Sequence, residues 1–159
     1  MRSVIDLNFN WKYCESFTEE MIKPDYDDSA FVSIDIPHTN KELPYNYFDE
    51  AMYQFVSCYR KEFTLPKSAT EKGKHVFISF EGAANYAKVY LNSVFIGEHK
   101  GGYTPFSFEI TDKLNKGKNY LVVMLDSTER SEIPPFGNVV DYLVYGGIGE
   151  TADPCKDLL

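Results

Sequence analysis

The sequence is poor in cysteine, and none of its apolar runs is long enough to cross a membrane. Its three cysteines, Cys14, Cys58 and Cys155, are widely spaced and form no CxxC pair. This usage is typical of reduced thiols rather than of a disulfide framework. The apolar runs fall short of the ~20 residues that a spanning helix needs, and no secretory signal is visible at the start. We therefore expect a cytoplasmic protein without a membrane partner.

Positive charge is also scarce. The chain has 16 Lys and Arg against 24 Asp and Glu, which gives a formal net charge of -8. Nucleic acids and anionic lipid surfaces attract basic patches, so the charge argues against both as partners. The charge does not argue against neutral ligands such as sugars.

Histidine is rare, and its placement gives no sign of a metal site. His38, His75 and His99 are not spaced from one another, or from a cysteine, as metal ligands commonly are. We expect a local structural role for His38, and either a structural or a solvent-facing role for His99. The sequence also lacks a phosphate loop, a dinucleotide fingerprint and a nucleophile elbow. We therefore expect no cofactor and no metal.

What the chain has in abundance is alternation of apolar and polar residues with a period of two. Val32, Ile34 and Ile36, for example, alternate with Ser33 and Asp35. This pattern is typical of antiparallel sheets packed face to face. It predicts an all-β fold, a mostly antiparallel jelly-roll β-sandwich of about eight short strands. The clearest expected strands are 32–36, 76–80, 87–91, 106–110 and 121–125.

Few residues favour helix, and turn residues separate the expected strands. Short helical turns are expected at 17–21, capped by Ser16 or Thr18, and at 112–114. Asn92-Ser93 is expected to form a two-residue hairpin turn, which requires either a positive φ at Ser93 or a change of turn type.

The less regular stretch 127–140 is expected to be a long loop. It contains Pro134-Pro135, and long loops on a sandwich often meet ligands.

Several residues that could carry chemistry have a simpler structural interpretation. We expect Trp11 to lie in the core and Glu81 to make structural hydrogen bonds. An acidic cluster is expected to be a solvated surface rather than a catalytic pair: Glu19, Glu20, Asp25, Asp27 and Asp28.

One group of aromatic residues leaves two interpretations open. Tyr45, Tyr47, Phe48 and Tyr53 could cover one end of the core, which is the commoner use of such residues, or stack on a sugar ring.

A series of phrases, in order along nearly the whole chain, resembles the N-terminal sugar-recognition domain of glycoside hydrolase family 2. The most specific phrase is Gly-Gly-Tyr-Thr-Pro-Phe at 101–106. The family includes β-galactosidases and β-glucuronidases, and the chain looks β-galactosidase-like. The matching phrases lie at 8–13, 36–39, 58–63, 80–83, 89–92, 101–106, 134–135 and 145–148.

The resemblance implies a jelly-roll domain followed by an immunoglobulin-like domain and a catalytic TIM barrel with two catalytic glutamates. A barrel takes ~250 residues, so none is encoded in these 159 residues. The resemblance therefore implies a carbohydrate-recognition domain that is inactive in isolation. It also implies two substrate contacts: Asp141, as a ligand for a sugar hydroxyl or a cation, and Gln54.

The end of the chain departs from the family pattern. Residues 149–159 show no alternation, so we expect the domain to span 1–148 and an atypical tail, as a truncation or frameshift would give, to follow. The expected partners are a galactoside-like carbohydrate and the missing catalytic domains. Two alternatives stay open. One is a free-standing carbohydrate-binding module using Tyr103 or Asp141. The other is a structural domain that forms a homo-oligomer through an exposed strand edge.

Overall fold

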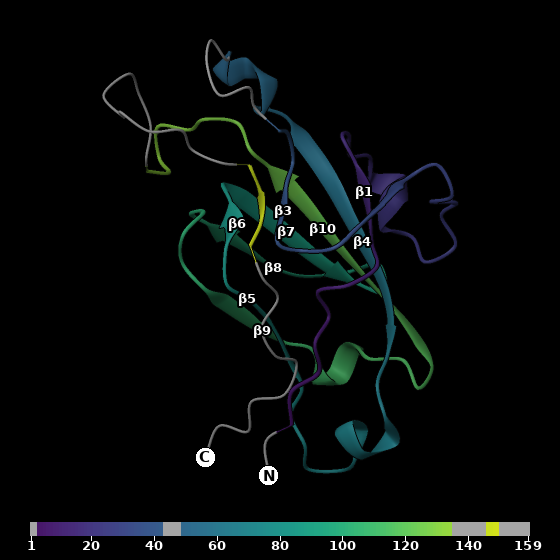
Figure 1. The fold of residues 1–159 in the computed structure, drawn as a ribbon. Helices are drawn as coiled ribbons and strands as arrows, with labels where there is room; N and C mark the ends of the chain where they lie inside the picture. The colour runs from purple at the N-terminus through teal and green to yellow at the C-terminus, as the bar shows by residue number, and fades with distance from the viewer. Residues whose placement is uncertain (1–2, 43–48, 135–145, 150–159) are drawn as a thin grey trace.

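Alternating apolar residues build a six-stranded sheet in the computed structural model, which describes residues 3–42, 49–134 and 146–149 (Figure 1). Each strand pairs with its neighbours in antiparallel register. The longest ladder joins the two central strands β4 and β10. In order across the sheet, the strands are β2 (Val32–Ile34), β1 (Trp11–Cys14), β4 (Val56–Thr64), β10 (Lys118–Asp126), β7 (Tyr86–Leu91) and β8 (Val94–Lys100).

Two smaller antiparallel sheets complete the described strands. One has the order β3 (His38–Thr39), β11 (Gly147–Ile148) and β6 (Ala83–Ala84), and the other pairs β5 (Phe77–Phe80) with β9 (Phe106–Glu109). Helix within the described residues is limited to four short 3₁₀ segments: η1 (Glu19–Ile22), η2 (Glu50–Met52), η3 (Lys67–Thr70) and η4 (Thr111–Lys113). None of the described helices could span a bilayer.

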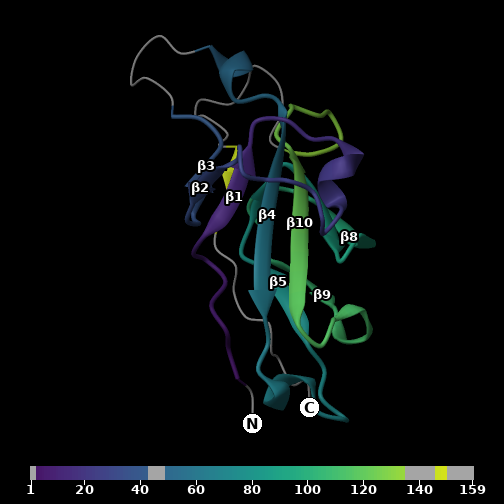
Figure 2. The ribbon, with the colours of Figure 1, turned by 90° about the vertical axis from the view of Figure 1, so that its right-hand side faces the viewer.

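The main core lies between the large sheet and the two smaller ones (Figures 1 and 2). Trp11, Tyr59 and Leu121 of the large sheet share this core with Phe80 of β5 and Ile148 of β11. All five are at most 1% exposed. The predicted all-β jelly-roll sandwich is confirmed, as is the core position of Trp11.

A second cluster covers the other face of the large sheet. Met21 and Phe31 pack there on Cys58 of β4 and Val122 of β10. From Leu121 to Asp126, both faces of β10 are therefore buried, whereas Lys118 at its start is exposed. The segment 15–31 forms the cover, and η1 lies within it.

Three details differ from the expectations. Val32 was expected on an apolar face, but it is 61% exposed because β2 is an edge strand with a neighbour on one side only. The first helical turn is 19–22, and Thr18 precedes it without a side-chain capping bond. Asp28, expected to be a solvated acid, makes an ion pair with the buried guanidinium of Arg60.

The hairpin between β7 and β8 turns at Asn92 and Ser93, as predicted. Their φ angles of 51° and 70° are both positive, as a type I′ turn requires. The side chain of Asn92 secures the turn because its Oδ1 accepts a hydrogen bond from the Tyr120 amide at 3.0 Å and its Nδ2 donates to the Lys113 carbonyl at 2.9 Å.

The described part of the domain reaches Gly149, whose amide donates to the Gly82 carbonyl at 2.9 Å. Gly149 is the first residue of the predicted atypical tail, and the rest of that tail, 150–159, lies outside the described residues.

Candidate functional site

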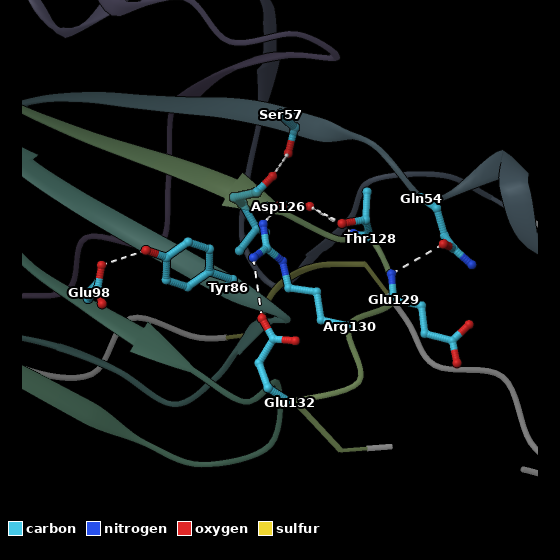
Figure 3. Close-up of polar contacts among 10 residues, drawn as sticks. Gln54, Ser57, Tyr86, Glu98, Asp126, Thr128, Glu129, Arg130 and Glu132 are labelled. Carbon is cyan, nitrogen blue, oxygen red and sulfur yellow. Dashed lines mark hydrogen bonds and ion pairs between the residues drawn. The ribbon is translucent and has the colours of Figure 1, made fainter. Parts of the chain in front are cut away.

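The central strand β10 ends at Asp126, where a connected group of polar side chains begins (Figure 3). Asp126 stands opposite Val56 of β4 on one side and Tyr86 of β7 on the other. The chain then enters segment 127–134, the described part of the predicted ligand-meeting loop. The polar group therefore lies at the junction of the large sheet with this loop.

The Asp126 carboxylate holds the start of the loop. Its Oδ1 accepts hydrogen bonds from the amide and the hydroxyl of Thr128, at 3.0 and 2.6 Å, and its Oδ2 makes an ion pair with Arg130. Burial alone would raise the pKa of Asp126, but the bonds from Thr128 and Arg130 outweigh it and leave this pKa lowered. Asp126 is thus a fixed anion that organises the loop.

Arg130 connects the loop to β7. Its Nη1 lies 3.5 Å from Glu132, and its guanidinium carbon lies 5.0 Å from the centre of the Tyr86 ring. The Tyr86 hydroxyl donates to Glu98 of β8, and this bond raises the pKa of Tyr86 to about 12.

Segment 127–134 is also held through its backbone. The Ser127 amide donates to the Phe55 carbonyl at 3.1 Å, and its hydroxyl donates to the Ala84 carbonyl at 2.8 Å. Ile133 is 2% exposed and forms an isolated bridge with Arg130. The loop therefore has a defined conformation as far as residue 134.

Gln54 lies at this end of the sandwich. Its Oε1 accepts a hydrogen bond from the Glu129 amide at 3.2 Å, so the side chain binds the loop directly (Figure 3). Asp141, the other predicted contact, lies outside the described residues. The predictions that these two residues contact a sugar remain predictions.

The aromatic cluster predicted near this end is described only in part. Tyr53 is 5% exposed, which agrees with a role in covering the core. Tyr45, Tyr47 and Phe48 lie outside the described residues. Tyr103, of the connection between β8 and β9, is 53% exposed.

Two histidines singled out from the sequence have structural surroundings. His38 Nδ1 lies 3.0 Å from the Tyr59 hydroxyl, and its ring centre is 4.6 Å from that of Tyr13. His99 Nε2 lies 2.9 Å from the Thr104 hydroxyl, and the His99 ring stacks on Phe106. The expected structural role of His38 is confirmed.

A different surface feature lies at the opposite end of β10. A shallow pocket of about 220 Å³ is lined there by Leu65, Lys67, Thr70, Asn115 and Lys116. None of the residues that the sequence singled out lines it.

The described polar group suits positioning and recognition rather than proton transfer. Asp126 and Glu132 are both bound to Arg130, so neither is a free acid or base. Among the described residues, no group of three His, Cys, Asp or Glu side chains could hold a metal ion. Sequence reasoning missed Asp126 and Arg130, although Asp-Ser-Thr after an apolar strand is a recognisable turn signal.

Comparisons with known proteins agree with this fold. The family model described as "Glycosyl hydrolases family 2, sugar binding domain" matches residues 12–136. The β-galactosidase of Thermoanaerobacterium thermosulfurigenes is 51% identical over 150 residues, which are 93% of this chain and 20% of that enzyme. The β-galactosidase of Thermoanaerobacter pseudethanolicus is 46% identical over 149 residues, 92% of this chain and 20% of that enzyme. The chain thus spans about a fifth of the length of these relatives.

Solved structures of the same family share the architecture. Bacteroides uniformis β-glucuronidase 2, covalently bound to cyclophellitol-6-carboxylate aziridine, aligns with a TM-score of 0.84 and 31% identity, over 98% of this chain and 18% of that chain. A structure described as Bacteroides uniformis β-glucuronidase aligns with a TM-score of 0.82 and 30% identity, over 96% of this chain and 17% of that chain. The chain therefore belongs to glycosyl hydrolase family 2, and it corresponds to the sugar-binding domain of that family.

Proposed function

We propose that this chain is the carbohydrate-recognition domain of a β-galactosidase-like enzyme that hydrolyses O-glycosyl bonds. The observation that carries the proposal is the identity of 51% and 46% to two proteins named β-galactosidase, in each case over more than nine-tenths of the chain. The proposed ligand is a galactoside-like carbohydrate, and the other proposed partner is the remainder of such an enzyme. We also propose that it acts in the cytoplasm.

The chemistry of hydrolysis indicates which groups this chain would supply and which would come from other domains. Cleavage of a glycosidic bond uses two carboxylates about 5–5.5 Å apart for retention or about 6.5–9.5 Å apart for inversion. At the described end of the sandwich, the carboxylates of Asp126 and Glu132 are held by Arg130. This chain would supply sugar contacts, and the catalytic carboxylates would come from the remaining domains.

The contacts that we propose are Asp141 and Gln54. Asp141 would bind a sugar hydroxyl or a cation at the rim of the active site. The amide oxygen of Gln54 already accepts one hydrogen bond from Glu129, and we propose that its amide nitrogen donates to the sugar. The bonds that hold segment 127–134 would place the chain leading toward Asp141.

The first experiment assays the purified chain with a nitrophenyl β-galactoside. We expect no turnover, and activity that persists after host enzyme has been excluded would contradict the proposal. In the second, this chain replaces the matching 150 residues of the Thermoanaerobacterium thermosulfurigenes enzyme. We expect the chimera to hydrolyse β-galactosides. Asp141→Ala should raise its KM, while Asp25→Ala, the same change at an exposed acid, should leave KM unchanged.

Other outcomes of these experiments would favour other functions. A folded chimera that prefers β-glucuronides would replace the proposed substrate. Calorimetric binding of a galactoside by the isolated chain would indicate a free-standing binding module. Concentration-dependent association in sedimentation, without sugar binding, would indicate a self-associating structural domain.

A further inference from the structure

Two cysteines stand directly opposite each other in the large sheet. Cys14, the last residue of β1, pairs in register with Cys58 of β4, and both thiols are free. Residues directly opposite in antiparallel strands point to the same face, with Cα atoms roughly 4.5–5.5 Å apart. A disulfide usually needs a Cα separation of about 4.4–6.8 Å. The backbone register therefore already meets the distance requirement for a cross-strand disulfide.

The two thiols share one environment but differ in access. Both lie on the covered outer face of the sheet, where Cys58 packs with Met21 and Phe31 and Cys14 packs against that cluster. Cys58 is fully buried, whereas Cys14 is half-buried, with its Sγ 3.3 Å from the Ser16 hydroxyl. A reagent in solution would therefore reach Cys14 first.

We propose that Cys14 and Cys58 form a thiol–disulfide modification site that joins β1 covalently to β4 when the surroundings become oxidising. A low-molecular-weight disulfide such as oxidised glutathione is the oxidant. The Cys14 thiolate attacks one sulfur of glutathione disulfide, and one glutathione thiolate leaves. Cys58 then loses its proton and attacks the Cys14 sulfur, which releases the second glutathione. One protein disulfide forms, one glutathione disulfide breaks, and the two thiol protons end on two glutathione thiols.

The environment of Cys58 determines how fast this happens. Burial raises the pKa of the Cys58 thiol to about 12, although Arg60 acts in the opposite direction. Little thiolate is present at neutral pH, so the second step is slow compared with exchange by an exposed dithiol. Its partner sulfur is the next-strand neighbour, however, so the attack needs no large movement of the backbone. The site would respond to lasting oxidation rather than to brief pulses.

The disulfide would change the mechanics of the sheet. β1 pairs with β4 on one side and with the edge strand β2 on the other. A covalent bond from Cys14 to Cys58 would fix this side of the sheet to its centre and restrict the unfolded chain between them. The oxidised protein should therefore unfold at a temperature several degrees higher than the reduced protein.

The experiment uses the 159-residue chain with Cys155→Ser, so that the third thiol cannot take part. The folded protein is equilibrated in glutathione buffers from fully reduced to fully oxidised and then alkylated. Mass spectrometry without reduction should detect a linked pair of peptides that contain Cys14 and Cys58. The midpoint of thermal unfolding should rise with the linked fraction and fall again after dithiothreitol.

Cys14→Ser provides the matched control, because it removes the half-buried thiol and leaves Cys58 in the core. Its unfolding temperature should be the same in oxidised and reduced buffers. Either of two results in the parent chain would overturn the proposal. One is a lasting glutathione adduct on Cys14 without the linked peptides, and the other is two alkylated thiols in the fully oxidised buffer.

Discussion

The Arg60 Nε donates a hydrogen bond to Asp28 Oδ2 at 2.9 Å, and this ion pair joins the outer face of β4 to the segment that covers it. The Arg60 side chain is 3% exposed and the Asp28 side chain 32%. The same guanidinium also donates to the carbonyls of Met21 and Lys23 and lies 5.4 Å from the centre of the Tyr26 ring. One buried cation thus holds a segment that has little regular structure of its own.

Replacing Arg60 should detach that cover. Arg60→Ala removes the ion pair, two bonds to carbonyls and the contact with Tyr26, so we expect the free energy of unfolding to fall by about 3–4 kcal/mol. Asp28→Asn keeps the bonds to the carbonyls and should cost only about 1–2 kcal/mol. Urea denaturation measures both. Asp25→Asn, at an exposed acid nearby, serves as the control and should change little, whereas equal losses in Asp25→Asn and Asp28→Asn would contradict this account.

Gly147 in β11 should not tolerate a side chain. Its φ is +141°, and a Cβ there would lie 2.0 Å from the His38 carbonyl oxygen, which belongs to the paired strand β3. We expect Gly147→Ala to lower the free energy of unfolding by ~3 kcal/mol. Gly117→Ala is the matched control, since a Cβ at that position meets nothing within 4 Å. Similar urea midpoints for the two variants would show that β11 is not held as described.

The hairpin turn leaves room for stabilisation. Ser93 has a φ of 70°, which glycine adopts without steric cost. Ser93→Gly should therefore raise the free energy of unfolding by about 0.5–1 kcal/mol, and Ser93→Val should lower it by at least as much. Thermal unfolding followed by circular dichroism distinguishes the variants. A lower midpoint for the glycine variant would show that the serine side chain matters more than the backbone angle.

His38 should make stability depend on pH. Burial lowers the pKa of His38 below its usual 6.5, so the unfolded chain binds a proton more readily than the folded one. Its contribution to stability is complete above about pH 6.5 and declines as the pH falls toward the lowered pKa of the folded state. We expect the urea midpoint to fall between about pH 7 and pH 5, and to fall less in His38→Gln. Part of the dependence should persist in the variant, because burial also lowers the pKa of His99.

Much of the fold could be predicted because it depends on alternation and turn residues. Val89 and Leu91 alternate with partly exposed neighbours in β7, and Asn92-Ser93 turns the chain where expected. The exposure of Val32 could not be predicted in this way. Its alternation is that of any strand, and only the order of strands in the sheet makes β2 an edge.

The Arg60–Asp28 pair and the candidate site were harder to predict, because both depend on contacts between distant segments. Arg60 lies in an ordinary alternating strand, and nothing near it in sequence indicates that Asp28 will meet it. Gln54 was selected for its place before the strand beginning at Val56, yet its partner is the backbone of Glu129, 75 residues away. The alternation of residues predicts the strands, whereas these two contacts are seen only in the tertiary structure.

The pairing of β4 with β10 also governs how this protein can be synthesised. Its register joins Val56 to Asp126, so the centre of the large sheet cannot close until Asp126 has left the ribosome. By then the other five strands of the large sheet have emerged, and β1 can already pair with β2 and β4, and β7 with β8. The apolar side chains of β4 therefore lack their β10 neighbours until β10 has been synthesised. Slower elongation or a shortage of chaperones should thus favour aggregation of the nascent chain more strongly than that of the finished domain.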